Sequence, residues 1–188
     1  MPLLCTMAPC HRFLLIIRPD ESVSTFVCAA RDRLHARIGS FSGRRVVPHL
    51  TLFFADLEEG LGPRLQQAVE ATAVALAPFG LTYSGITHFP DGRTIYIDPV
   101  EKERIGAMRA PLAAAALADP RIGQAIRETT HPHLTIAAGL RPDQFKEAWA
   151  MLAPHRFAAA EEVRHVQLLR RPLVPGAEYA LMAAIPLG

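Results

Sequence analysis

The sequence predicts an α+β fold made of two similar halves, and three observations support this. Short strand-like segments alternate with amphipathic helical segments along the 188 residues. The order of these segments repeats loosely in the second half. The tetrapeptide Pro-His-Leu-Thr occurs once in each half, at 48–51 and at 132–135. Because 50% of the residues are hydrophobic and 20% are charged, we expect residues 1–188 to form one domain with two pseudo-symmetric lobes.

The first half is predicted in the order strand, helix, strand, helix and hairpin. Its strand segments are aliphatic or β-branched runs, and its helical segments carry apolar residues three and four positions apart. Gly39 ends the first helix, Pro63 begins the second, and Pro90-Asp91-Gly92 supplies the hairpin turn. Arginines in the first helix are expected on its solvent side: Arg31, Arg33 and Arg37. The expected segments are 13–17, 23–38, 46–54, 63–76, and the strand pair 81–89 and 94–97.

The second half repeats this order from the strand region near 94–99, which both halves share. A helical segment precedes the strand with the second tetrapeptide, and another helix and a strand pair follow it. The helices after the two tetrapeptides both end in Ala-Pro. The expected segments are 105–116, 132–136, 145–152, and the strand pair 163–169 and 179–185.

Each tetrapeptide is expected to present its histidine and threonine together, because residues two apart in a strand point to the same face. His49 then projects beside Thr51, and His133 beside Thr135. An imidazole has an unperturbed pKa of about 6.5, so both of its protonation states are available near neutral pH. A threonine hydroxyl donates readily to a phosphate oxygen. If the two pairs face one another, one histidine as base and the other as acid can open a strained 2′,3′-cyclic phosphate without a metal.

Three more residues are candidate substrate contacts by their position relative to these pairs. Phe53 follows Thr51 by two residues and is expected to form a wall of the same pocket. Of Phe53 and Phe54, one is expected to face the cleft and the other the core. Tyr96 points away from the neighbouring isoleucines, as a base-stacking residue or as a partly buried core tyrosine. His131 lies two residues before His133 and is expected at the rim of the site. A metal bound by His49, His131 and His133 is the alternative, but no carboxylate or cysteine at suitable spacing completes such a site.

The remaining composition excludes several classes of function. A net charge of +2 is too small for coating long nucleic acid, although it is compatible with binding one or two phosphates. No apolar run is long enough to cross a bilayer, and no P-loop, GxSxG or Rossmann motif is present, so we expect no cofactor. Cys5, Cys10 and Cys28 have no metal-type spacing, and the N-terminal MPLLCTMAPC lacks the features of a secretory signal. We therefore expect a cytoplasmic monomer.

PHLTLFF at 48–54 and PHLTI at 132–136 resemble the two signature motifs of the 2H phosphoesterase superfamily. Within it, the chain is most similar to the bacterial 2′-5′ RNA ligase / RNA 2′,3′-cyclic phosphodiesterase family, from FLLIIRP at 13–19 to YALMAAIPL at 179–187. The resemblance implies a bilobal fold in which two antiparallel sheets flank a central cleft and helices lie outside. It also implies that the two histidines are the acid and base, that the two threonines bind phosphate, and that the partner is an RNA end or a small nucleotide.

The resemblance leaves the substrate and the direction of the reaction open. In this family the closing hairpin borders the cleft, so Arg170 and Arg171 are expected to contact phosphate. The residues after the second motif, Ala137-Ala138-Gly139, include no aromatic ring, which argues against base stacking by this part of the second lobe. Run in reverse, the same acid–base pair joins a 5′-hydroxyl to a cyclic phosphate as a ligase. Further alternatives are a nucleotide-binding module with weak turnover and a phosphodiesterase for another 2′-5′ or cyclic nucleotide.

Overall fold

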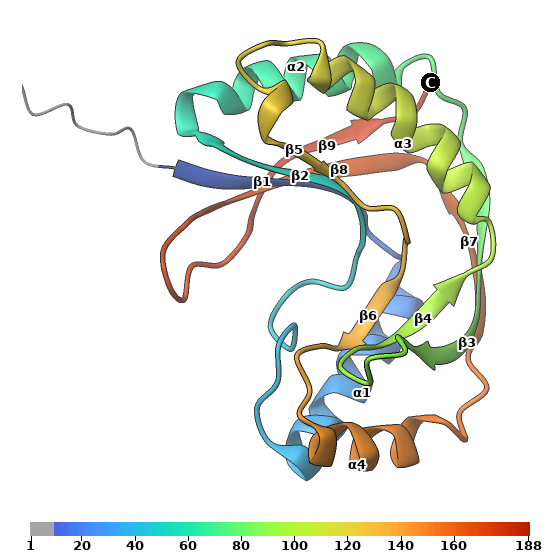
Figure 1. Ribbon diagram of the computed structural model, residues 1–188. Coiled ribbons are helices and arrows are strands. Elements are labelled where there is room, and N and C mark those ends of the chain that lie inside the picture. Colours follow the sequence, from blue (N-terminus) through green and yellow to red (C-terminus); the bar gives the residue numbers. More distant parts are fainter. Residues whose placement is uncertain (1–9) are drawn as a thin grey trace, which may run out of the picture.

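The computed structural model describes residues 10–188 (Figure 1). The N-terminal segment MPLLCTMAPC, which was expected not to be a secretory signal, lies outside this range except for Cys10. Cys5 therefore also lies outside it. The strands are β1 (Cys10–Ile17), β2 (Leu50–Glu58), β3 (Phe79–His88), β4 (Ile95–Pro99), β5 (Ile126–Glu128), β6 (Leu134–Ala137), β7 (Ala158–Val163), β8 (His165–Pro172) and β9 (Ala180–Pro186). The helices are α1 (Glu21–Ile38), α2 (Gly62–Ala73), α3 (Lys102–Leu117) and α4 (Pro142–Leu152), with 3-10 turns at Glu59–Leu61 and Gly123–Ala125.

The strands form a curled antiparallel sheet in the order β7-β3-β4-β6-β2-β1-β8-β9, and β5 also pairs with β2. The α+β class with antiparallel strands and outer helices is confirmed. The two expected sheets are hydrogen-bonded into one, because β2 and β6 meet at the pair Leu50 and Leu134. We call the strands β5, β2, β1, β8 and β9 the first lobe, and the strands β6, β4, β3 and β7 the second lobe. Each lobe carries one tetrapeptide.

The helices cover the outer face of the curled sheet (Figure 1). Helices α2 and α3 pack together over the first lobe, whereas α1 and α4 pack together over the second. The N-terminal helix α1 therefore lies against β6, although the strand that follows it, β2, belongs to the first lobe. Because α1 packs against the second lobe and is connected to β2 of the first lobe, it lies close to both tetrapeptides.

Two predicted strands differ from the structure by more than three residues, and one strand was not predicted. The predicted strand 163–169 is two strands, because the chain crosses between lobes at Arg164: β7 pairs with β3 and β8 pairs with β1. Strand β2 begins four residues later than predicted, at Leu50, and continues to Glu58. The short strand β5 was not predicted. The split of 163–169, the bounds of β2 and the presence of β5 all depend on which strands pair. The periodicity of apolar residues along the chain carries no information about strand pairing.

The core alternates between the two faces of the central strands. On β1, Phe13, Leu15 and Ile17 join the main core beneath the helices. Leu14 and Ile16 point to the other face, where they pack with Leu169 in a separate small cluster. We call this second face the inner face of the sheet.

Two further findings concern membrane-spanning helices and cysteines. Among the helices between residues 10 and 188, none has the length and apolar character that crossing a bilayer requires. Cys10 and Cys28 are exposed free thiols.

Candidate active site

The two tetrapeptides meet where the lobes join. In both, the proline and leucine are buried, and the histidine and threonine are partly exposed. Leu50 and Leu134 are an antiparallel pair, and both are fully buried in the main core. Extending this register by one residue sets His49 opposite Thr135 and Thr51 opposite His133. All four side chains then project from the inner face, because alternate residues of a strand point to opposite faces.

This register also fixes how far apart the histidines are. His49 and His133 are diagonal neighbours on one face of an antiparallel pair, a relation that separates residues by about 7–8 Å and their β-carbons by somewhat less. The charge of His133 lowers the pKa of His49, as expected for two imidazoles this close. A single phosphate group fits between two imidazoles at such a separation, with each ring within hydrogen-bond reach of one of its oxygens.

Both histidines are held in the same tautomer by the same local hydrogen bond. The Nδ1 atom of His49 lies 2.7 Å from the carbonyl oxygen of Val47, and that of His133 lies 2.8 Å from the carbonyl oxygen of His131. A carbonyl oxygen only accepts, so Nδ1 carries the proton and donates it. The neutral ring is left with its lone pair on Nε2. The buried proline between donor and acceptor, with its fixed φ, sets the chain path that allows this bond.

The pKa of both histidines is lowered, above all because burial disfavours the charged imidazolium. Their charged surroundings then differ. The cations of Arg31 and His133 lower the pKa of His49 further. For His133, the charge of His131 lowers the pKa and the carboxylate of Asp98 opposes this by raising it. Of the two rings, His133 therefore has a nearby anion that favours its protonated form.

A pocket of about 680 Å³ opens beside the first histidine–threonine pair. It is lined by His49 and Thr51, by apolar residues of the inner face such as Leu14 and Phe54, and by the closing hairpin between β8 and β9. Two arginine–aromatic stacks form its walls: Arg12 over Phe54 at 4.7 Å, and Arg171 over Tyr179 at 5.1 Å, each from the guanidinium carbon to the ring centroid. A pocket of this size and chemistry suits one nucleotide.

The arginines near this pocket differ in whether they form a salt bridge. Arg12 forms two 2.7 Å hydrogen bonds with Asp56, its cross-strand partner. Arg171 has no salt bridge within residues 10–188, and its buried Nε has no hydrogen-bond partner there. The predicted phosphate contact at Arg171 thus lies in the pocket. Arg170 lies outside the pocket lining and forms a 3.0 Å salt bridge with Glu59, so a phosphate contact at Arg170 stays a prediction.

The expectation that Phe53 forms a wall of the pocket is also wrong, and a β-bulge explains why. The register between β1 and β2 shifts: Leu15 pairs with Phe53, but Ile16 pairs with Thr51. Leu52 is the extra residue, and a bulge of this kind reverses the alternation beyond it. Phe53 is consequently buried in the main core, whereas Phe54 shares the inner face with Thr51 and lines the pocket.

Matched substitutions are expected to separate these two phenylalanines. Phe53→Ala leaves a cavity in the core and should lower the free energy of unfolding by about 3–5 kcal/mol. Phe54→Ala should change stability far less but weaken nucleotide binding by about 1–3 kcal/mol, the usual value of one base–aromatic stack. Chemical denaturation and calorimetric titration with 3′-AMP measure the two effects. The assignment fails if Phe53→Ala weakens binding while Phe54→Ala does not.

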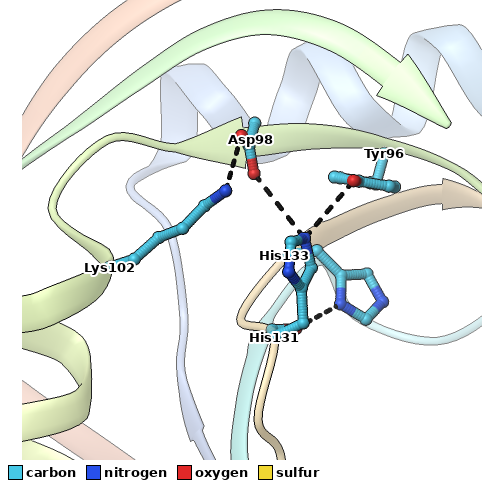
Figure 2. A network of polar contacts seen from close by, with 5 residues as sticks. All are labelled: Tyr96, Asp98, Lys102, His131 and His133. Atoms are coloured by element: carbon cyan, nitrogen blue, oxygen red, sulfur yellow. Dashed lines mark hydrogen bonds and ion pairs between the residues drawn. The ribbon is translucent and has the colours of Figure 1, made fainter. Parts of the chain in front are cut away.

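The second lobe supplies aromatic rings of its own (Figure 2). Tyr96 pairs in register with Thr135, and its ring centroid is 5.3 Å from that of His133. Phe89 lies 4.6 Å from Tyr96 and 5.0 Å from His133. The absence of rings after the second motif argued against stacking by that segment, and the strand β4 and the turn before it provide the rings instead.

His131 links the second motif to a charged pair on β4 (Figure 2). Its Nε2 lies 3.3 Å from the Tyr96 hydroxyl and 4.0 Å from Oδ1 of Asp98, whose Oδ2 accepts a 2.7 Å bond from Lys102. Its carbonyl holds His133. His131 thus lies beside His133, and its expected place at the rim of the site stays a prediction. Over residues 10–188, no group of three or more His, Cys, Asp or Glu side chains is arranged to hold a metal ion.

Sequence reasoning missed several residues of this region: Arg12, Phe89, Asp98 and Arg31. The alternation that identified Tyr96 places Asp98 on the same face and was a sufficient signal for it. Arg12 shares its face of β1 with Leu14 by the same rule. The choice between Phe53 and Phe54 required the bulge, and Arg31 was predicted on the solvent side of α1, yet it is only 3% exposed.

Comparison with known proteins identifies relatives at two levels. The family model described as the 2′-5′ RNA ligase superfamily matches residues 19–174. A search of curated proteins finds no match. Among solved structures, TT0787 of Thermus thermophilus has a TM-score of 0.72 at 22% identity, covering 94% of this chain and 97% of its own. Escherichia coli LigT has a TM-score of 0.66 at 15% identity in complex with 3′-AMP, covering 95% and 98%, and 0.64 at 16% in complex with ATP, covering 96% and 99%. At these identities the structural likeness shows a shared fold.

Proposed function

The chain belongs to the 2′-5′ RNA ligase superfamily, and from this premise we propose that it is a metal-independent phosphodiesterase that opens 2′,3′-cyclic phosphates on RNA ends or small nucleotides. The observation that carries the proposal is the antiparallel pair of Leu50 and Leu134. Through it, the side chains of both His-x-Thr motifs share the inner face, with both Nε2 atoms free for proton transfer.

The proposed reaction needs two protons to move at one phosphorus atom. Water attacks phosphorus while a neutral imidazole takes a water proton at Nε2. The bond from phosphorus to one ribose oxygen breaks, and the other imidazole, which is protonated, gives its Nε2 proton to that oxygen. Thr51 and Thr135 donate hydrogen bonds to the non-bridging oxygens. Proton exchange with solvent resets the histidines, and the reverse reaction with a 5′-hydroxyl is ligation.

We assign His49 as the base and His133 as the acid for hydrolysis. The cation of Arg31 lowers the pKa of His49, which favours the neutral ring that a base requires. The carboxylate of Asp98 raises the pKa of His133 and so partly offsets burial and the charge of His131, whereas no anion within residues 10–188 acts in this way on His49. Burial still holds both pKa values below the ordinary one, so the substrate phosphate itself is expected to help charge His133 on binding.

The surroundings of the two pairs suit a nucleotide. The pocket beside His49 offers the Phe54 and Tyr179 rings and Arg171, for which residues 10–188 provide no salt bridge. The second lobe offers Phe89 and Tyr96 beside His133. LigT, which shares the fold, has been crystallised with 3′-AMP and with ATP. The free exposed thiols of Cys10 and Cys28 are in keeping with a reducing cytoplasm.

The test is turnover in the presence of a chelator. Purified protein in EDTA is given 2′,3′-cyclic AMP and a short RNA that ends in a 2′,3′-cyclic phosphate, with 3′,5′-cyclic AMP as the control substrate. We expect hydrolysis of the first two to a monoester, followed by ³¹P NMR, and no hydrolysis of the third. Binding of 3′-AMP without any turnover would instead indicate a binding module, and activity abolished by EDTA would indicate a metal enzyme.

A further inference from the structure

Arg31 of α1 is a buried cation placed behind the two tetrapeptides. It is 3% exposed and has no salt bridge within the part of the chain that the structure describes. Burying an unpaired guanidinium costs several kcal/mol unless its donors are satisfied, and here backbone carbonyls satisfy them. For packing alone, an apolar side chain of similar size costs less.

The three carbonyls that Arg31 binds come from both motif segments. Nη1 donates to the carbonyl of Val46, three residues before His49. Nη2 donates to the carbonyl of Thr135 at 2.8 Å, and Nε donates to that of Ile136 at 3.2 Å. One rigid, planar group therefore joins the chain leading into the first motif to the strand of the second.

The contacts of Arg31 lie where the two lobes of the sheet share the fewest paired residues. Strands β2 and β6 share one register pair, Leu50 with Leu134, whereas the neighbouring strand pairs β1–β2 and β1–β8 run for six or more residues. One backbone bridge, between Ser42 and Ala138, also connects the loop before the first motif to the second lobe. The relative position of the two histidines thus depends on few contacts, and Arg31 makes three of them.

We propose that Arg31 is a positioning residue for the paired-histidine reaction: its guanidinium fastens the two motif segments together and so fixes the separation of His49 and His133. Arg31 is too deeply buried to contact substrate, so it acts through the backbone. The inference rests on the proposed function, because the fixed separation matters only if both histidines serve one phosphate. A misplacement of about 1 Å in such a site is sufficient to cost about 100-fold in rate.

Two substitutions distinguish geometry from charge. Arg31→Lys keeps the cation but cannot reach three carbonyls, and Arg31→Met removes both. We expect kcat for 2′,3′-cyclic AMP to fall by about 100-fold in each, with KM changed far less. In Arg31→Met alone, loss of the cation should raise the pKa of His49, so the acidic limb of the kcat/KM profile moves to higher pH. Arg33→Met, at an exposed position of the same helix, is the control and should change neither quantity.

Histidine and arginine NMR make the test independent of turnover. In the wild-type protein, the Arg31 guanidinium protons should be protected from exchange, and the His49 titration should move upward in Arg31→Met but not in Arg31→Lys. If the wild-type protein has no activity, the proposed function fails while these signals still test the contacts of Arg31. Rapid exchange of the Arg31 protons, or a folded Arg31→Lys with wild-type kcat, would overturn the proposal.

Discussion

Replacement of His49 or His133 by alanine is expected to lower kcat for a 2′,3′-cyclic nucleotide by about 10²–10⁴-fold, with only a small change in KM. Each imidazole supplies one proton transfer in the transition state, and a positioned general acid or base is worth that factor. Because neither ring is needed to stack the base, ground-state binding should survive. Steady-state kinetics with 2′,3′-cyclic AMP, together with calorimetric binding of 3′-AMP, measure both quantities.

The matched control for these variants is His155→Ala, which removes an exposed histidine after α4. It should leave kcat and KM unchanged. Each active-site variant should also keep the wild-type Tm within a few degrees, since both rings lie on the inner face and not in the core. Full activity in either His49→Ala or His133→Ala would refute the paired mechanism.

Thr51→Val and Thr135→Val are expected to lower kcat by about 10²–10³-fold each. Valine matches the shape of threonine but removes the hydroxyl that donates to a non-bridging oxygen, and loss of one such donor typically has this effect. Thr51→Ser and Thr135→Ser keep the hydroxyl and should retain most of the activity. The comparison of serine with valine at each position is made by kcat at saturating substrate. Equal rates for the two replacements would mean that the hydroxyls do not act on the transition state.

Much of this site could be predicted because the positions of its side chains follow from the sequence within each strand. The alternation of side chains in a strand places each histidine with its threonine, and it needs no knowledge of the partner strand. The same rule placed Tyr96 on the inner face, where the structure puts it beside Thr135. The repeat of Pro-His-Leu-Thr predicted that two such pairs exist, and the antiparallel pair of Leu50 with Leu134 brings them together.

The errors arise where tertiary pairing overrides local pattern. Phe53 and Phe54 exchange roles because Ile16 on β1 pairs with Thr51, and a bulge set by a partner strand leaves no periodic trace. Arg31 sits on a helix whose charged residues otherwise face solvent. Its burial follows from the packing of α1 against the strand of the opposite motif, a topological fact absent from helical spacing.

The central claim is that His49 and His133 act on one phosphate in one step, and the double variant His49→Ala/His133→Ala tests it most directly. Residues that act as a unit show strongly non-additive losses, because removing the second costs little once the first is gone. We expect kcat of the double variant for 2′,3′-cyclic AMP to lie within about tenfold of the slower single variant. A double variant whose loss is the product of the two single losses would show that the histidines act independently, and would contradict the account.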